Sequence, residues 1–168
     1  MSKSWLSLFL MCSLSFSGTA AAVSRKTINR EVRRFVGGSK LWIHDSCSIT
    51  RNDVRKLLTD GLYNLRKLNP QVVDRIRQTR LYGVLLFVEI RCGEIGHNGG
   101  VWGGVPFVAG TINIGSQLDE RVLMHEFLHQ FGFMGWREQT TDECAYAALD
   151  EDPTPEQYPL CAAFRLIL

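Results

Sequence analysis

The sequence predicts an α+β domain, a small sheet with flanking helices. Within Thr50–Asn69 apolar residues recur at helical spacing, and Thr50 followed by Asp53 forms a capping-box start. Leu81–Arg91 contains a nearly continuous apolar run, which is typical of a strand buried on both faces. In Val105–Gly115, apolar residues alternate around a central asparagine, and this pattern predicts a second strand.

The other segments give the order helix, strand, helix, strands, helix, loop, short helix. Ser24–Val36 is expected to be a basic surface helix that ends at the glycines after it. Cys92–Gly104 is so rich in glycine that we expect no regular element there, but the rim of a cleft. The remaining expectations are a strand at Lys40–His44, a further turn or two from Pro70 to Arg80, a loop at Phe133–Thr140, a helix at Thr141–Asp150 and a Pro-rich turn at Asp152–Pro159.

The first 22 residues have the features of a secretory signal peptide. Lys3 supplies a positive start, Trp5–Phe16 an apolar run, and Ala20–Ala22 a small-residue cleavage site. We therefore expect residues 1–22 to be removed and residues 23–168 to form one domain, secreted or periplasmic. No second apolar run is long enough to predict a transmembrane helix.

Four cysteines remain once Cys12 is removed with the leader, an even number in an oxidising compartment. Two disulfides are expected, from three possible pairings. We predict Cys144 with Cys161, because the Pro-rich turn between them lets the chain fold back, and this leaves Cys47 with Cys92.

Charge is distributed unevenly along the chain. Val23–Arg91, the basic half, carries 15 Lys and Arg against 6 Asp and Glu, whereas Cys92–Leu168, the acidic half, carries 3 against 11. A basic half can bind an anionic partner such as nucleic acid, lipid headgroups or envelope polymer. Alternatively the two halves face each other, and the net charge of only +2 favours that interpretation. We expect no nucleic-acid partner and a monomer, with an anionic contact through the basic half left open.

The most specific pattern is His125-Glu126-Phe127-Leu128-His129, inside a predicted helix at Ser116–Gly132. Residues four apart share a helix face, so both histidines can bind one metal ion. Glu126 lies about 100° further round, where it can accept a proton from a metal-bound water without being a ligand. The alternative, a core helix whose histidines only hydrogen-bond to neighbours, suits an isolated histidine better than this spacing. One Zn²⁺ ion is therefore the expected cofactor.

This motif and its surroundings resemble the zincin metallopeptidases, over roughly Val105–Ala148. The resemblance implies a helix beneath a small twisted sheet whose edge strand, within Val105–Gly115, lines the substrate cleft. Gly135 stands where metzincins have a third histidine, which excludes that subgroup. Gluzincins instead take a glutamate from the next helix, which points to Glu143, and Thr140–Ala147 imperfectly echoes the aspzincin motif at the same position.

We therefore expect Glu143 to be the third ligand, with Asp142 supporting a ligand histidine. Glu138 is a weaker candidate because it falls in the predicted loop. Tyr146 or His97 could stabilise the oxyanion formed from a substrate. Alternatively, Tyr146 packs against the motif-bearing helix and His97 is solvated in a loop. The expected function is a zinc-dependent endopeptidase acting on polypeptides, with Glu126 as general base. One alternative is an extracytoplasmic binding protein for an anionic envelope component, in which His97 or His44 supplies a fourth ligand that closes a structural zinc site. The other is a zinc amidohydrolase acting on a non-protein amide.

Overall fold

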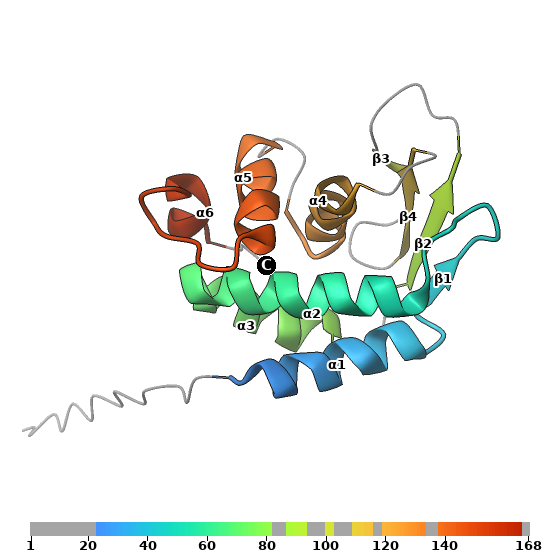
Figure 1. Ribbon diagram of the computed structural model, residues 1–168, viewed down its shortest axis with the longest axis horizontal. Helices are drawn as coiled ribbons and strands as arrows, with labels where there is room; N and C mark the ends of the chain where they lie inside the picture. The colour runs from blue at the N-terminus through green and yellow to red at the C-terminus, as the bar shows by residue number, and fades with distance from the viewer. Residues whose placement is uncertain are drawn as a thin grey trace, which may run out of the picture.

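The computed structural model describes residues 23–81, 87–93, 100–102, 109–115, 119–133 and 138–165. The fold is α+β, as predicted (Figure 1). The elements are α1 (Arg25–Gly37), β1 (Leu41–Ile43), α2 (Arg51–Leu68), α3 (Pro70–Ile76), the π-helical turn η1 (Arg77–Leu81), β2 (Phe87–Cys92), β3 (Gly100–Trp102), β4 (Ala109–Ile114), α4 (Glu120–Gln130), α5 (Glu138–Leu149) and α6 (Pro159–Ala163).

Helix α2 is the central element, because α1, α3, α4 and α5 all pack against it (Figure 1). Its start is the predicted capping box: the Thr50 hydroxyl accepts from the backbone N–H of Asp53, and the Asp53 carboxylate accepts from that of Thr50. At its end Asn69 is buried, and its side-chain amide donates to the backbone carbonyls of Cys161 and Phe164. One asparagine therefore ends α2, starts α3 and holds the C-terminal segment.

The four strands lie in the order β1-β2-β4-β3, with β1, β2 and β4 parallel and β3 antiparallel to β4. Three predictions were wrong here. The glycine-rich segment contains the strand β3, which is stabilised by backbone hydrogen bonds to β4 despite its glycine. Because β3 lies outside β4, the strand predicted within Val105–Gly115 is not at the edge of the sheet. The strand predicted within Leu81–Arg91 is β2, and it is not buried on both faces: Val88 and Ile90 face the core, but Phe87 is exposed. The earlier part of that apolar run lies outside the described residues.

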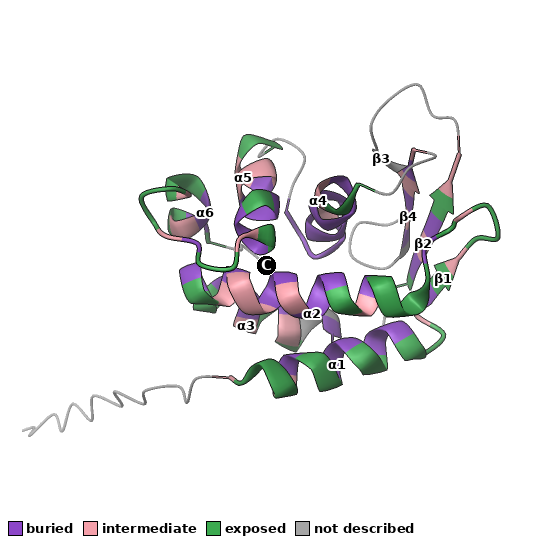
Figure 2. Cartoon of the chain, viewed as in Figure 1, coloured by how far each residue is buried: buried purple, intermediate pink, exposed green. Residues whose placement is uncertain are grey.

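The core lies between the inner face of the sheet and the helices, as the purple positions of Figure 2 show. A side chain at Gly110 would collide with the buried amide of Gln130, so this glycine lets α4 approach β4 closely. Met124 of α4 is similarly close to Gly61 of α2. These small residues fix α4 between the sheet and the central helix.

Both predicted disulfides, Cys47–Cys92 and Cys144–Cys161, are present. The first joins the segment after β1 to the end of β2, and the second joins α5 to α6. Within the described ranges, no helix has both the length and the apolar character needed to cross a bilayer. The predicted signal peptide lies outside the described residues.

Candidate metal centre

Helix α4 carries the H-E-x-x-H motif, and its ends follow from local sequence. Asp119 caps it by accepting from the backbone N–H groups of Arg121 and Val122. Gly132 ends it with a φ of 109°, a left-handed value that favours glycine. The predicted cap Ser116 lies outside the described residues.

The two histidines meet as their spacing predicts. Nε2 of His125 lies 2.9 Å from Nε2 of His129, one helical turn further on. Both side chains are largely enclosed, with 8 % and 14 % of their surface exposed. The histidines thus offer two nitrogens at one point on the face of α4 that is turned toward α5.

The third group at this point is Glu138, the first residue of α5. Its carboxylate oxygens lie 2.9 Å from Nε2 of His125 and 3.3 Å from Nε2 of His129. Among the described residues these three form a group that could hold a metal ion, one ligand atom from each lying within 4.8 Å of the others. Glu138 is 61 % exposed, so the group opens to solvent on its α5 side.

The other ring nitrogens determine where the protons sit. Nδ1 of His129 is 2.7 Å from the backbone carbonyl of Phe133, which can only accept, so that nitrogen carries the proton. In the neutral ring, Nε2 then carries a lone pair and no proton. Nδ1 of His125 lies 2.9 Å from Oδ1 of Asp142, although without hydrogen-bond alignment. A carboxylate at that nitrogen favours the same tautomer.

With both imidazoles neutral and in this tautomer, three electron-pair donors converge at one point. Their mutual repulsion is relieved by a cation, and N, N, O is a ligand set that suits Zn²⁺. The 2.9 Å between the two Nε2 atoms and the 2.9 Å from His125 Nε2 to Glu138 Oε1 are slightly below the edge of about 3.3 Å expected for a tetrahedron with metal–ligand bonds of about 2.0 Å. His129 Nε2 lies 3.3 Å from the other oxygen of Glu138, Oε2. The residues present fit a metal ion in both chemistry and spacing.

Glu126 follows the first histidine and is 6 % exposed. Its Oε2 is buried and has no hydrogen-bond partner among the described residues. Burial is the main reason that its pKa is raised, to about 7; the charges of Glu138 and Asp142 raise it further, while His129 lowers it. A carboxylate with such a pKa can both accept and return a proton near neutral pH.

Glu143, the predicted third ligand, is not in this group. Its Oε1 accepts a hydrogen bond from the backbone N–H of Cys161, 3.0 Å away, on the side of α5 that faces α6. Helix α5 begins at Glu138, three residues earlier than predicted, and its packing rotates it so that Glu143 faces α6. Glu138 and Asp142, four apart, thereby share the face toward α4, and Glu143 lies about 100° away. The expectation that Asp142 supports a ligand histidine agrees with its position.

Tyr146 and His44 are not among the three residues of this group. Tyr146 is 52 % exposed, one turn beyond Asp142, and its ring centroid lies 5.2 Å from the guanidinium of Arg121. Arg121 also pairs with Asp142 at 3.2 Å. His44 follows β1, which lies at the edge of the sheet opposite to β3, and its ring contacts the Ser46 hydroxyl. His97 lies outside the described residues, so its predicted role is untested.

Comparisons of the chain with protein-family models, with curated proteins and with solved structures gave no match, so its functional interpretation depends on the geometry of this centre.

Proposed function

We propose that this protein is a zinc-dependent metallopeptidase, an endopeptidase of the zincin type, that cleaves polypeptides outside the cytoplasm. The observation that supports the proposal most directly is the convergence of the His125, His129 and Glu138 donor atoms within 4.8 Å. The H-E-x-x-H spacing and the buried Glu126, whose Oε2 has no hydrogen-bond partner among the described residues, add the residue types that hydrolysis needs.

The number of donors favours an enzyme over a closed structural site. Catalytic zinc sites use three protein ligands and keep one position open, whereas structural sites use four. The group contains three among the described residues, and His44 lies elsewhere in the sheet. Exposure of Glu138 leaves a route for substrate to reach the centre.

His125, His129 and Glu138 would hold the ion, and Zn²⁺ bound there would polarise the scissile carbonyl and lower the pKa of a water. The Phe133 carbonyl keeps His129 in the tautomer that offers Nε2, and the charge of Asp142 favours the same tautomer of His125. Glu126 takes a proton from the attacking water and returns it to the leaving amine, for which its raised pKa is suited.

The decisive experiment incubates the disulfide-bonded protein, loaded with zinc, with denatured casein and a peptide library, with and without a chelator. We expect new amino termini that the chelator abolishes and zinc restores. Intact casein and peptides, despite one tightly bound zinc, would overturn the peptidase proposal. Release of amines from a non-peptide amide would then identify the amidohydrolase alternative.

A second measurement tests the ligand set independently of activity. Zinc titration against a chromophoric chelator should show at least a 100-fold loss of affinity in Glu138→Gln. Glu143→Gln is the matched control, since it removes the same charge from the same helix but away from the histidines, and should bind zinc nearly as the native protein does. The reverse result would restore Glu143 as the ligand.

A further inference from the structure

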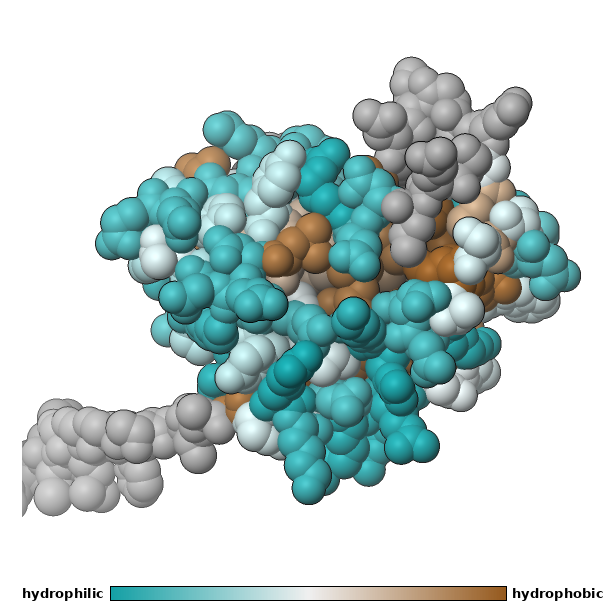
Figure 3. All heavy atoms as spheres, in the orientation of Figure 1, coloured by the Kyte–Doolittle hydropathy of each residue, from teal (hydrophilic) through white to brown (hydrophobic). Residues whose placement is uncertain are grey.

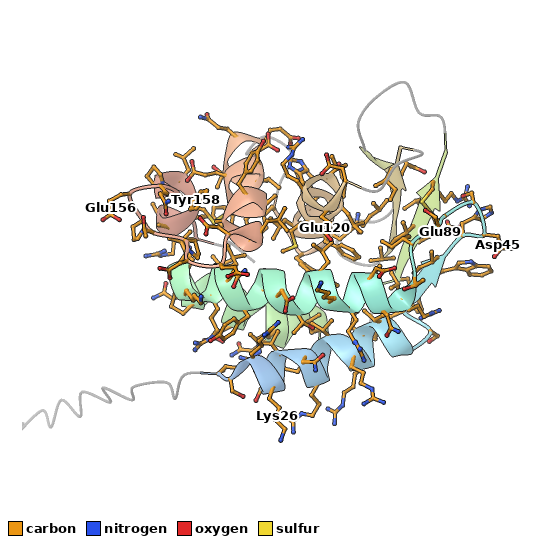
Figure 4. All side chains as sticks on the ribbon, in the orientation of Figure 1. Lys26, Asp45, Glu89, Glu120, Glu156 and Tyr158 are labelled. Atoms are coloured by element: carbon orange, nitrogen blue, oxygen red, sulfur yellow. A yellow bond between two sulfur atoms is a disulfide. The ribbon has the colours of Figure 1, made fainter. Side chains whose placement is uncertain are left out.

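The outer face of α1 carries the densest positive charge among the described helices, and it takes no part in the metal centre. Every valine, isoleucine and phenylalanine of α1 is buried against the rest of the protein (Figure 2). Five of its seven exposed positions are cationic, the others being Asn29 and Gly37, and the space-filling view is hydrophilic over this helix (Figure 3). Lys26, labelled in Figure 4, points away from α2.

Four of these cations form one stripe: Lys26, Arg30, Arg33 and Arg34, at positions i, i+4, i+7 and i+8. The stripe is about 12 Å long at 1.5 Å per residue. None of the four has an ion-pair partner among the described residues. Arg25, at the start of the helix, differs because it pairs with Asp60.

The acid of α1 does not neutralise the stripe. Glu31 is 1 % exposed and points inward, where Arg77 donates to both of its oxygens, at 2.5 and 2.7 Å. The stripe therefore presents cations alone along two turns of helix, and like charges held this close repel one another until an anion binds.

The acidic half of the chain does not cover the stripe either. The side-chain ion pairs of the basic half, such as Arg25–Asp60, Arg66–Asp74 and Arg91–Glu89, find their acids within that half. Arg121–Asp142 lies wholly within the acidic half. The two halves do meet at a cavity lined by Arg25, Lys56 and Lys67 on one side and Glu120 and Glu151 on the other, but none of the four stripe cations lines it. The charge of the stripe itself is therefore left for an external anion.

We propose that this stripe binds a linear polymer that carries phosphate groups. Three of its four cations are arginines, whose planar guanidinium groups bind phosphate oxygens in pairs. A membrane-surface helix would need apolar side chains to insert, and those of α1 are buried. Recognition of unstacked bases would need an exposed aromatic side chain, and α1 has none. The stripe suits a flexible chain whose charges lie along it.

The test measures binding of the disulfide-bonded protein to inorganic polyphosphate as a function of salt. We expect affinity to fall steeply with salt, because each cation releases a counterion from the polymer. The variant Arg30→Gln/Arg33→Gln/Arg34→Gln should lose at least tenfold in affinity and show a shallower salt dependence. Its melting temperature should stay close to that of the native protein, since these side chains are exposed.

The matched control is Lys56→Gln/Lys67→Gln/Arg91→Gln, which removes three exposed cations from other surfaces. It should retain polyphosphate affinity within about twofold of the native protein. An equal loss in both variants would overturn the proposal, because net charge alone would then explain binding. Tighter binding to anionic phospholipid vesicles than to polyphosphate would replace it with a membrane contact, and binding to heparin alone would refute the choice of phosphate.

Discussion

Two buried glutamates in this protein have opposite surroundings. Glu31, between α1 and η1, receives two hydrogen bonds from Arg77, which in turn contacts Asp74 at 2.8 Å. Glu126, on α4, keeps one oxygen that is buried and has no partner among the described residues. Both side chains are nearly inaccessible, so burial alone does not distinguish them.

The difference separates a structural carboxylate from one suited to catalysis. A fully paired buried carboxylate stays ionised and fixes how its elements pack. An unpaired one resists ionisation, so its pKa rises toward the range in which it can exchange protons. If this distinction is right, changes to Glu126 should act on chemistry, and changes to Glu31 on stability.

The largest expected effect is on catalysis by Glu126→Gln. The amide cannot accept a proton from water, so hydrolysis of casein should fall by about three or more powers of ten. Zinc affinity should change little, since Glu126 is not among the converging donors. Turnover and zinc titration on the same preparation measure both. A variant that stays active would exclude Glu126 as the base.

The matching change, Glu31→Gln, should spare zinc binding and destabilise the fold. It leaves the Arg77 guanidinium with one carboxylate instead of two, and breaking a buried pair costs roughly 3 to 5 kcal/mol. Urea unfolding measures the loss, with the exposed Glu156→Gln as control at under about 0.5 kcal/mol. If Glu31→Gln also costs so little, the ion pair does not hold α1 in place.

A third prediction uses pH on the metal-free protein. The folded-state pKa of Glu126 is about 7 against an ordinary 4.5, so the folded chain keeps a proton that the unfolded chain has released. The stability that this proton gives is complete below pH 4.5 and is lost as pH rises to about 7, a change of up to about 3 kcal/mol. The free energy of unfolding, measured by urea titration in the presence of a chelator, should fall with pH across this range, and it should fall less in Glu126→Gln than in the native protein. The same pH dependence in both proteins would contradict the raised pKa.

Local signals in the sequence were sufficient for much of this structure. The Thr50 and Asp53 capping box and the helix stop at Gly132 were predicted from neighbouring residues. The Cys144–Cys161 disulfide was predicted from the Pro-rich turn between its cysteines, and Cys47–Cys92 by elimination. The contact between the two histidines was also predictable, because i, i+4 spacing within one helix needs no knowledge of the rest of the fold.

Contacts between elements were not predictable in the same way. Thr140 and Thr141 are good helix caps, so the sequence favours a start there, yet α5 begins at Glu138 and Thr141 is fully buried inside it. Whether Asp142 or Glu143 faces α4 depends on how α5 is rotated, and packing against α2, α4 and α6 sets that rotation. The sequence did contain one signal for the observed arrangement: Glu138 and Asp142 are four residues apart, so they share a face if the helix includes both.

The smallest expected effect concerns Asp142, a carboxylate whose situation is intermediate between those of Glu31 and Glu126. It is 42 % exposed, contacts His125 Nδ1 at 2.9 Å and shares Oδ1 with Arg121 at 3.2 Å. Asp142→Asn removes the charge that favours the Nδ1–H tautomer while keeping the shape, so zinc affinity should fall about 10- to 100-fold. Arg121→Gln should have a weaker effect of the same sign, because Arg121 acts only through Asp142. Competition titration with a chromophoric chelator resolves both, and unfolding in urea without metal should be nearly unchanged. If Asp142→Asn binds zinc with native affinity, the Asp142 carboxylate does not orient His125, and its contacts with His125 and Arg121 do not contribute to zinc binding.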